Sequence, residues 1–184
     1  MRKLYEITAF SGVAHGRVSA VEFEQRCGTN VAGAPRSLRI TLQPYQASDY
    51  PYPPSIEARI VESLGGIWSP YTGRTFASRR ETDIEHIVAR SEAHDSGLCA
   101  ATAETRRRFA TDLLNLTLAS PGVNRGQKGA RDAAEWLPNR NKCWFADRVV
   151  RVRQKYGLTI NRREADALDR VLASCTSTAL VRGG

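Results

Sequence analysis

Apolar residues recur at helical spacing in three stretches of the chain. Residues 56–64 show this spacing and are followed by Gly65-Gly66, which predicts a short helix that ends at the glycines. Two more helices are predicted over residues 144–156, ended by Gly157, and over residues 162–173, with Asn161 as N-cap. The predicted buried positions are Ile56, Ile60, Val61 and Leu64, then Phe145, Val149, Val152 and Tyr156, then Leu168, Val171 and Leu172.

The pattern between these helices changes to that of short strands. Residues 83–88 and 113–119 are predicted strands, and residues 71–74 form a hairpin-like turn before the first of them. Helix formers fill residues 99–112, and Pro121 is typical of a first helical turn. We therefore expect a helix over residues 124–136 that stops before Pro138. The predicted fold class is α+β. The predicted order is a strand, an inserted segment, a second strand and a helix, with further helices after them.

Residues 1–54 are predicted to be an N-terminal elaboration of unknown role. They contain a possible strand at residues 38–42, and the proline- and tyrosine-rich run that follows cannot continue a helix, so it is a loop or an extended arm. The remaining residues 55–184 form one predicted domain, since compact domains typically span about 100–200 residues.

The composition is that of a folded protein with a basic surface. A hydrophobic fraction of 41% with 25% charged residues disfavours wholesale disorder. The net charge of +8 attracts polyanions, which makes nucleic acid the natural partner, although a protein that is merely basic remains the alternative.

Compartment and metal type follow from the cysteines and the N-terminus. The chain has four cysteines and no Cys-x-x-Cys pair, so no structural zinc is expected. Charged and polar residues interrupt the apolar runs of residues 1–20, which makes a poor secretory signal, and no run of about 18 apolar residues occurs. We expect a cytoplasmic protein with mostly reduced thiols, with secretion as the alternative.

Glu85-His86 and Asn124 supply the residue types that phosphodiester hydrolysis needs. A histidine with a pKa near 6.5 can take a proton from water, so His86 is the candidate base. Glu85 and Asn124 offer hard oxygen ligands for Mg²⁺ or Mn²⁺, and Asp83, on the same strand, could face the metal or hydrogen-bond to one of its ligands. Neighbours on a regular strand face opposite sides, so we expect Glu85-His86 where the strand breaks.

Basic residues near this stretch are candidate contacts to a nucleic-acid backbone. They are Arg106, Arg107, Arg125 and Lys128. A solvated helix face explains them almost as well, and one arginine of the 106–108 run has Glu104 or Asp112 as an alternative partner.

Residues 83–128 resemble the HNH, or His-Me finger, endonucleases. The run "TDIEHIVARSEAHDSG", the segment "RRRFATDLLNLTLASPGVNRGQKGARDAAEWLP" and the final "C" of "DALDRVLASC" are similar to the DUF1524 branch of that superfamily. The resemblance covers about the last two-thirds of the chain. It implies a ββα-metal core and a metal-dependent endonuclease acting on DNA, with RNA possible, that leaves 5′-phosphate and 3′-hydroxyl ends.

Residue roles follow from the same resemblance. His86 is implied to activate water, Glu85 and Asn124 to ligate one Mg²⁺ or Mn²⁺, and Asn115 to brace the loop and orient the histidine. Cys143 and Cys175 are implied to pair, with two reduced thiols as the alternative. Glu85 departs from the aspartate that many relatives carry. A catalytically weak DNA-binding protein on this scaffold and a ribonuclease are the rival functions.

Overall fold

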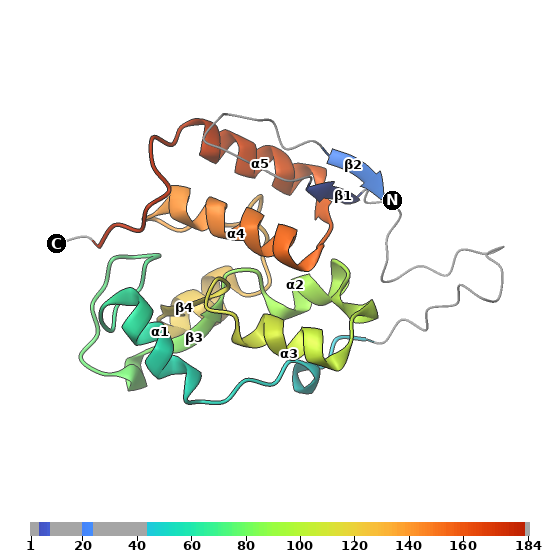
Figure 1. Cartoon of the computed structure of the whole chain (residues 1–184). Helices are drawn as coiled ribbons and strands as arrows, with labels where there is room; N and C mark the ends of the chain where they lie inside the picture. The colour runs from blue at the N-terminus through green and yellow to red at the C-terminus, as the bar shows by residue number, and fades with distance from the viewer. Residues whose placement is uncertain (1–3, 8–19, 24–43, 183–184) are drawn as a thin grey trace.

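A computed structural model describes residues 4–7, 20–23 and 44–182, which form an α+β fold (Figure 1). Its strands are β1 (Leu4–Ile7), β2 (Ala20–Phe23), β3 (Asp83–His86), β4 (Leu116–Ala119) and β5 (Ile160–Asn161). Its α-helices are α1 (Ile56–Leu64), α2 (Arg90–Asp95), α3 (Ala103–Thr111), α4 (Lys142–Tyr156) and α5 (Arg162–Ala173). Shorter helical segments are η2 (Ala47–Asp49), η3 (Arg79–Glu81), η4 (Leu98–Ala100) and the π-helical η5 (Gly122–Lys128).

The strands form two small antiparallel sheets. One has the order β2-β1-β5 and joins the N-terminal strands to the segment before α5. The other pairs β3 with β4, with Glu85 opposite Thr117 and His86 opposite Leu116. After β4 the chain turns directly into η5, whereas α2, η4 and α3 lie between β3 and β4 in the sequence.

The main core lies between the C-terminal helices and the rest of the domain. Figure 1 shows α4 and α5 as one layer, with α1, α3 and the β3-β4 sheet beneath it. The buried residues come from α3, α4, the segment before α5 and α5, and include Phe109, Phe145, Val149, Leu158 and Leu168. A second cluster packs α1 on β4 through Ile56, Ile60, Leu116 and Leu118.

A buried charge cluster ties α2 to the two C-terminal helices. Arg153 of α4 is 1% exposed and binds Glu164 of α5 at 2.6 Å and Glu92 of α2 at 2.9 Å. Its guanidinium also donates to the Ser96 hydroxyl and to the Thr159 carbonyl oxygen. Every partner satisfies a charge or dipole that would otherwise be costly to bury.

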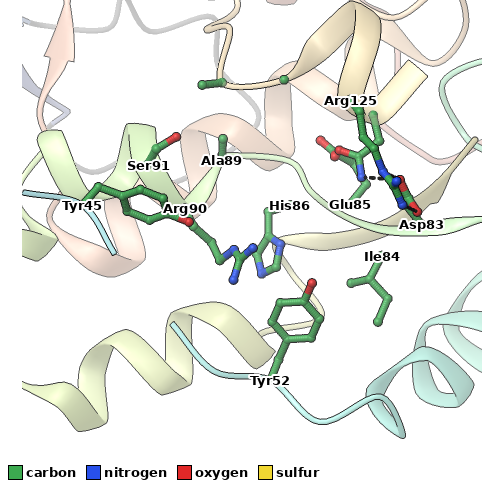
Figure 2. A pocket seen from close by; sticks show the side chains of 13 residues that line it. Tyr45, Tyr52, Asp83, Ile84, Glu85, His86, Ala89, Arg90, Ser91 and Arg125 are labelled. Atoms are coloured by element: carbon green, nitrogen blue, oxygen red, sulfur yellow. Dashed lines mark hydrogen bonds and ion pairs between the residues drawn. The ribbon is translucent and has the colours of Figure 1, made fainter. Parts of the chain in front are cut away.

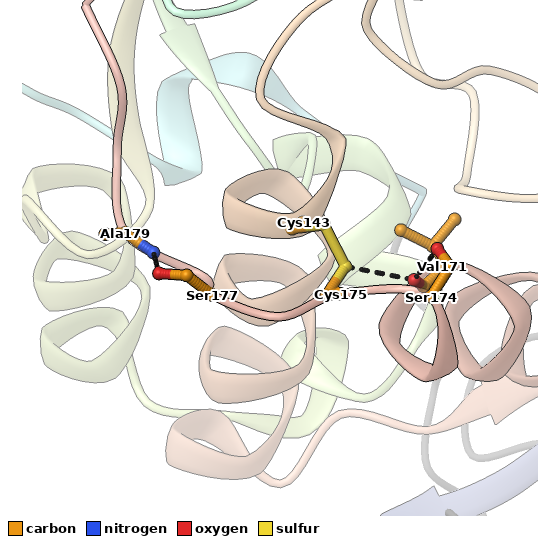
Figure 3. The surroundings of a disulfide bond; sticks show 6 residues. All are labelled: Cys143, Val171, Ser174, Cys175, Ser177 and Ala179. Atoms are coloured by element: carbon orange, nitrogen blue, oxygen red, sulfur yellow. Dashed lines mark hydrogen bonds between the residues drawn. A yellow bond between two sulfur atoms is a disulfide. The ribbon is translucent and has the colours of Figure 1, made fainter.

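A disulfide joins the start of α4 to the end of α5 (Figure 3). Cys143 lies in the first turn of α4 and Cys175 just after α5, with their Cα atoms 5.8 Å apart. No cysteine within residues 44–182 is a free thiol.

Several predicted elements agree with the structure. The first and third predicted helices have the predicted bounds, and Asn161 caps α5 by accepting a hydrogen bond from the Glu164 N–H. The turn at residues 71–74 is flanked by the Trp68–Thr75 bridge. The possible strand at residues 38–42 lies outside the described residues. No helix in the described part of the chain is both long and apolar enough to span a membrane.

The helix predicted over residues 124–136 is wrong beyond Lys128. The helical segment begins at Gly122 and stops before Gly129, whose φ of 51° and ψ of −128° leave helical space. The Asp132 carboxylate then accepts the N–H groups of Ala134 and Glu135, which competes with helical hydrogen bonding. Asn161 holds Asp132 from the other side, so tertiary contacts stabilise the turn.

Candidate active site

A pocket of about 380 Å³ opens along β3 (Figure 2). Among the described residues β3 pairs only with β4, so its other edge is free to face this space. The pocket is lined by residues of β3, the start of α2, the loop before α1, η5 and the turn after it. They are Tyr45, Tyr52, Asp83, Ile84, Glu85, His86, Ala89, Arg90, Ser91, Asn124, Arg125, Gly129 and Ala130.

His86, the last residue of β3, has one ring nitrogen held by the backbone of α3. Its Nε2 lies 3.0 Å from the Ala110 carbonyl oxygen, which can only accept, so Nε2 carries the proton and donates. The neutral ring therefore keeps its lone pair on Nδ1. Burial, helped by the Arg90 and Lys128 charges and opposed by the Ala110 contact, lowers the pKa of His86 to about 3. The ring is a neutral acceptor at ordinary pH.

Two side chains from outside the strands surround the His86 ring. The Tyr52 ring lies 5.3 Å from it, centroid to centroid, and the Arg90 guanidinium carbon lies 5.1 Å from the Tyr52 ring. On the other side the Phe109 ring stacks on His86 at 6.3 Å. These contacts fix the ring plane and leave it little freedom to rotate.

Glu85 points away from His86 and into a buried ion pair. Its Oε1 lies 2.8 Å from Nζ of Lys128, and the two side chains are 3% and 0% exposed. Lys128 also donates to the His86 carbonyl oxygen at 3.1 Å. Burial raises the pKa of Glu85, while the Lys128 ammonium and the Tyr71 hydroxyl act in the opposite direction. Glu85 is nevertheless one of the residues that line the pocket.

Asp83 and Asn124 meet at the other end of β3. Nδ2 of Asn124 donates to Oδ2 of Asp83 at 3.1 Å, and Arg125 binds the same carboxylate through two hydrogen bonds, the shorter at 2.6 Å. The Asp83 side chain is 14% exposed and the Arg125 side chain 73%. Asp83 is thus paired by an exposed cation, whereas Glu85 is paired by a buried one.

Asn115 is fully buried and bonds to the segment just after His86. Its Oδ1 accepts from the Val88 N–H at 2.8 Å, its Nδ2 donates to the Val88 carbonyl oxygen at 3.1 Å, and its own carbonyl oxygen accepts from the Ile87 N–H. The side chain does not touch His86. It holds the backbone on which His86 is placed.

The oxygen donors of the pocket suit a hard divalent cation. Two carboxylates and one amide, from Asp83, Glu85 and Asn124, line the same space. Mg²⁺ typically uses one or two protein carboxylates and completes its shell with water and substrate oxygens. Within residues 44–182 no cluster of three or more His, Cys, Asp or Glu side chains forms a fuller cage. The donor set therefore fits Mg²⁺ or Mn²⁺, in competition with Arg125 and Lys128.

The predicted role of Lys128 needs correction, whereas those of Arg106, Arg107 and Arg125 stay predictions. Lys128 was expected to contact a phosphate backbone, but its side chain is fully buried against Glu85 and cannot reach a surface ligand. Arg106 is half-buried and donates weakly to the Cys99 carbonyl oxygen. Arg107 and Arg125 are exposed, and Arg107 pairs with Glu104, one of the partners weighed for the 106–108 run.

The expected break follows the Glu85-His86 pair directly, because β3 ends at His86 and not at residue 88 as predicted. The strand runs through both Glu85 and His86, and their side chains diverge as strand geometry requires, towards η5 and α3 respectively. The free edge of β3 lets both reach one pocket.

Sequence reasoning missed Tyr52, Arg90 and the Ala110 carbonyl. Tyr52 lies in the segment assigned to an arm, and Arg90 opens a helix, α2, that was not predicted. Every residue has a backbone carbonyl, so the sequence does not indicate which one contacts His86. The one usable signal was position, since Arg90 follows the motif by only four residues.

Comparisons with known proteins add two findings about relatives. A protein of Arthroderma benhamiae named "Uncharacterized secreted protein" is 30% identical over 123 residues, which are 65% of this chain and 60% of the relative. The chain thus spans less than two thirds of that relative. No solved structure matches.

The cytoplasmic location predicted from the sequence is contradicted by the secreted relative. The Cys143–Cys175 disulfide agrees with that correction, because such bonds persist in oxidising compartments. The interrupted apolar runs at the N-terminus were a weak basis for a location.

A family model described as "GmrSD restriction endonucleases, C-terminal domain" matches residues 58–171. That range holds both strands of the site, η5 and nearly all of α4 and α5, and with them His86, Asn115 and Asn124. The chain belongs to the family of GmrSD restriction endonuclease C-terminal domains.

Proposed function

We propose that this protein is a metal-dependent endonuclease that hydrolyses DNA phosphodiester bonds and leaves 5′-phosphate and 3′-hydroxyl ends. Membership of a restriction-endonuclease family supports nuclease activity on DNA in general. The observation that carries the finer proposal is the state of His86, a neutral ring whose proton is held on Nε2 by Ala110 while Nδ1 stays an acceptor.

His86 acts as general base in this proposal. Nδ1 takes a proton from a water that attacks phosphorus, and the Ala110 carbonyl oxygen stabilises the charge that then develops on the ring. Asn115 contributes by holding the Val88 backbone, and with it the end of β3, in place. Water activation of this kind typically contributes about 10²–10⁴-fold.

Asp83, Glu85 and Asn124 would hold the metal ion. When bound, a divalent cation neutralises charge on the phosphate and on the leaving oxygen. We retain Glu85 and Asn124 as ligands and add Asp83, because it is already within hydrogen-bond distance of Asn124 and its partner Arg125 is exposed enough to move aside. The run β3, β4, η5 corresponds to the ββα-metal core in this proposal.

We infer that the protein works outside the cell. The secreted relative and the disulfide both support this location. Extracellular DNA is then the substrate pool, and the basic net charge of +8 would favour its capture.

The test is cleavage of supercoiled plasmid by purified wild-type protein and by His86→Ala, with Mg²⁺, with Mn²⁺ and with chelator. We expect nicking by wild type with either metal, none with chelator, and loss of cleavage but not of DNA binding in His86→Ala. End-labelling with and without phosphatase identifies the 5′ ends. No nicking at any metal concentration would exclude the proposal.

A weakly catalytic DNA-binding protein is the second candidate. The observation that favours it is that each carboxylate of the pocket already has a cation partner, Arg125 or Lys128. Binding without cleavage in the plasmid assay would select it. Parallel digestion of RNA tests the ribonuclease alternative.

A further inference from the structure

Arg90 lines the pocket, and within residues 44–182 its guanidinium forms no ion pair with a carboxylate. Asp83 binds Arg125 at 2.6 Å and Glu85 binds Lys128 at 2.8 Å. Arg90, at the first position of α2, has no carboxylate partner within residues 44–182. With the carboxylates neutralised, its charge makes the pocket attractive to an anion.

Carbonyl oxygens hold Arg90 in position. Its Nη1 lies 3.2 Å from the Tyr50 carbonyl oxygen and 3.4 Å from that of Ala47. The guanidinium also lies over the Tyr52 ring at 5.1 Å. The side chain is therefore oriented before any ligand arrives, which reduces the entropy lost on binding.

The remaining donors of Arg90 have the geometry that phosphate needs. A guanidinium has five N–H donors in a planar fork, and the carbonyl contacts use only Nη1. The Nε–H and Nη2 groups form the edge that binds two phosphate oxygens side by side.

Tyr52 places this edge beside the candidate base. The same ring that lies 5.1 Å from the guanidinium carbon lies 5.3 Å from the centroid of His86 (Figure 2). A phosphate bound by Arg90 is thus near the ring nitrogen that would activate water.

We propose that Arg90 binds the non-bridging oxygens of the scissile phosphate and stabilises the charge that grows on them during cleavage. The inference rests on the proposed function. In the step itself the water oxygen bonds to phosphorus, the bond from phosphorus to O3′ breaks, His86 takes the water proton, and solvent supplies a proton to the leaving oxygen. Arg90 forms no covalent bond and keeps its proton throughout.

The test compares Arg90→Gln and Arg90→Lys with Arg170→Gln, which removes an exposed arginine on α5, outside the pocket. Affinity for a fluorescent twelve-nucleotide DNA is measured in chelator by anisotropy at several salt concentrations, and kcat is measured with Mg²⁺. Near-ultraviolet circular dichroism checks that the Tyr52 loop stays folded.

We expect Arg90→Gln to weaken DNA binding about 10-fold, to reduce the salt slope by about one, and to lower kcat about 10²-fold. Arg90→Lys should restore the salt slope, because the charge is kept, but only part of kcat, because the fork is lost. Arg170→Gln should match wild type. A merely structural role would change folding but not the salt slope.

Two outcomes separate this inference from the proposed function. If wild type cleaves DNA and a folded Arg90→Gln matches it in salt slope and kcat, the function stands and the role of Arg90 is overturned. If wild type cleaves no DNA but Arg90→Gln binds DNA more weakly than wild type, the endonuclease function is wrong. The catalytic role of Arg90 is then wrong too, and only the contact of Arg90 with phosphate stands.

Discussion

The Nε2 atom of His86 lies 3.0 Å from the carbonyl oxygen of Ala110, and this contact decides which ring nitrogen can accept a proton. A carbonyl has no proton to give, so the ring must donate through Nε2. The tautomer that a general base requires is set by the backbone of α3, before metal or substrate binds.

The pH dependence of cleavage should lack the acid limb of an ordinary histidine. An exposed histidine protonates below about pH 6.5 and would then stop working as a base. Burial, helped by the Arg90 charge, lowers the pKa of His86 to about 3, so the ring stays neutral across that range. We expect kcat/KM at saturating metal to stay level from about pH 8 to about pH 5.5. An acid midpoint near pH 6.5 in the wild-type profile of kcat/KM would contradict this.

Breaking the Glu85–Lys128 pair should destabilise the fold strongly. Lys128→Met leaves a buried carboxylate without its cation, which typically costs about 3–5 kcal/mol of unfolding free energy. The double variant Glu85→Gln with Lys128→Met removes both charges and should recover most of that loss. Urea unfolding measures the free energy of unfolding of wild type, Lys128→Met and the double variant. Equal stability of Lys128→Met and wild type would mean that Lys128 is not part of the buried framework.

Metal dependence should separate the three oxygen donors of the pocket. Asn124→Ala and Glu85→Ala should each raise the metal concentration that gives half-maximal cleavage, and Asp83→Asn should do the same if Arg125 yields its place. We expect shifts of about 10–100-fold, as for other metal-site substitutions. Asp166→Asn, an exposed change on α5, is the control. An unchanged metal requirement in all three variants would show that the ligand set is wrong.

Loss of the disulfide should lower stability without changing the site. Cys143 and Cys175 are 32 residues apart in the sequence. Their disulfide restricts the unfolded chain, which typically stabilises the fold by about 2–4 kcal/mol. The paired variant Cys143→Ser with Cys175→Ser should unfold at lower urea concentration yet keep wild-type kcat at low temperature. A reducing agent should shift wild type in the same direction. If kcat falls in the folded double variant, the bond also positions the site.

Local signals were sufficient for the elements that depend on local interactions. The helix ending at Gly65 and the helix capped by Asn161 have their predicted bounds, because the glycine at the end and the asparagine cap act within one turn. The helix expected after Asn124 stops at Gly129, and the Asp132 turn that follows is held by Asn161, a partner far away in the sequence. No window around residue 132 contains that information.

The same distinction applies to the site. His86 and Asn124, singled out by the motif, line one pocket, and Asn115 binds the backbone just after His86, while the roles predicted for them stay predictions. The sequence did not predict that Lys128 turns inwards, because a lysine in a short glycine-rich segment is ordinarily solvated. Its burial follows from the strand alternation that sends Glu85 into the interior, where a cation is needed.

The Arg153 cluster can be completed only late in the synthesis of the chain. Arg153 is synthesised before Glu164. Until α5 leaves the ribosome, the Arg153 guanidinium therefore lacks the Glu164 carboxylate, and burying its charge costs more free energy. The helix that follows the base-bearing strand, held through Glu92, gains its firm anchor only at that stage. A nascent chain therefore carries the candidate site residues before α5 completes the charge cluster that anchors α2.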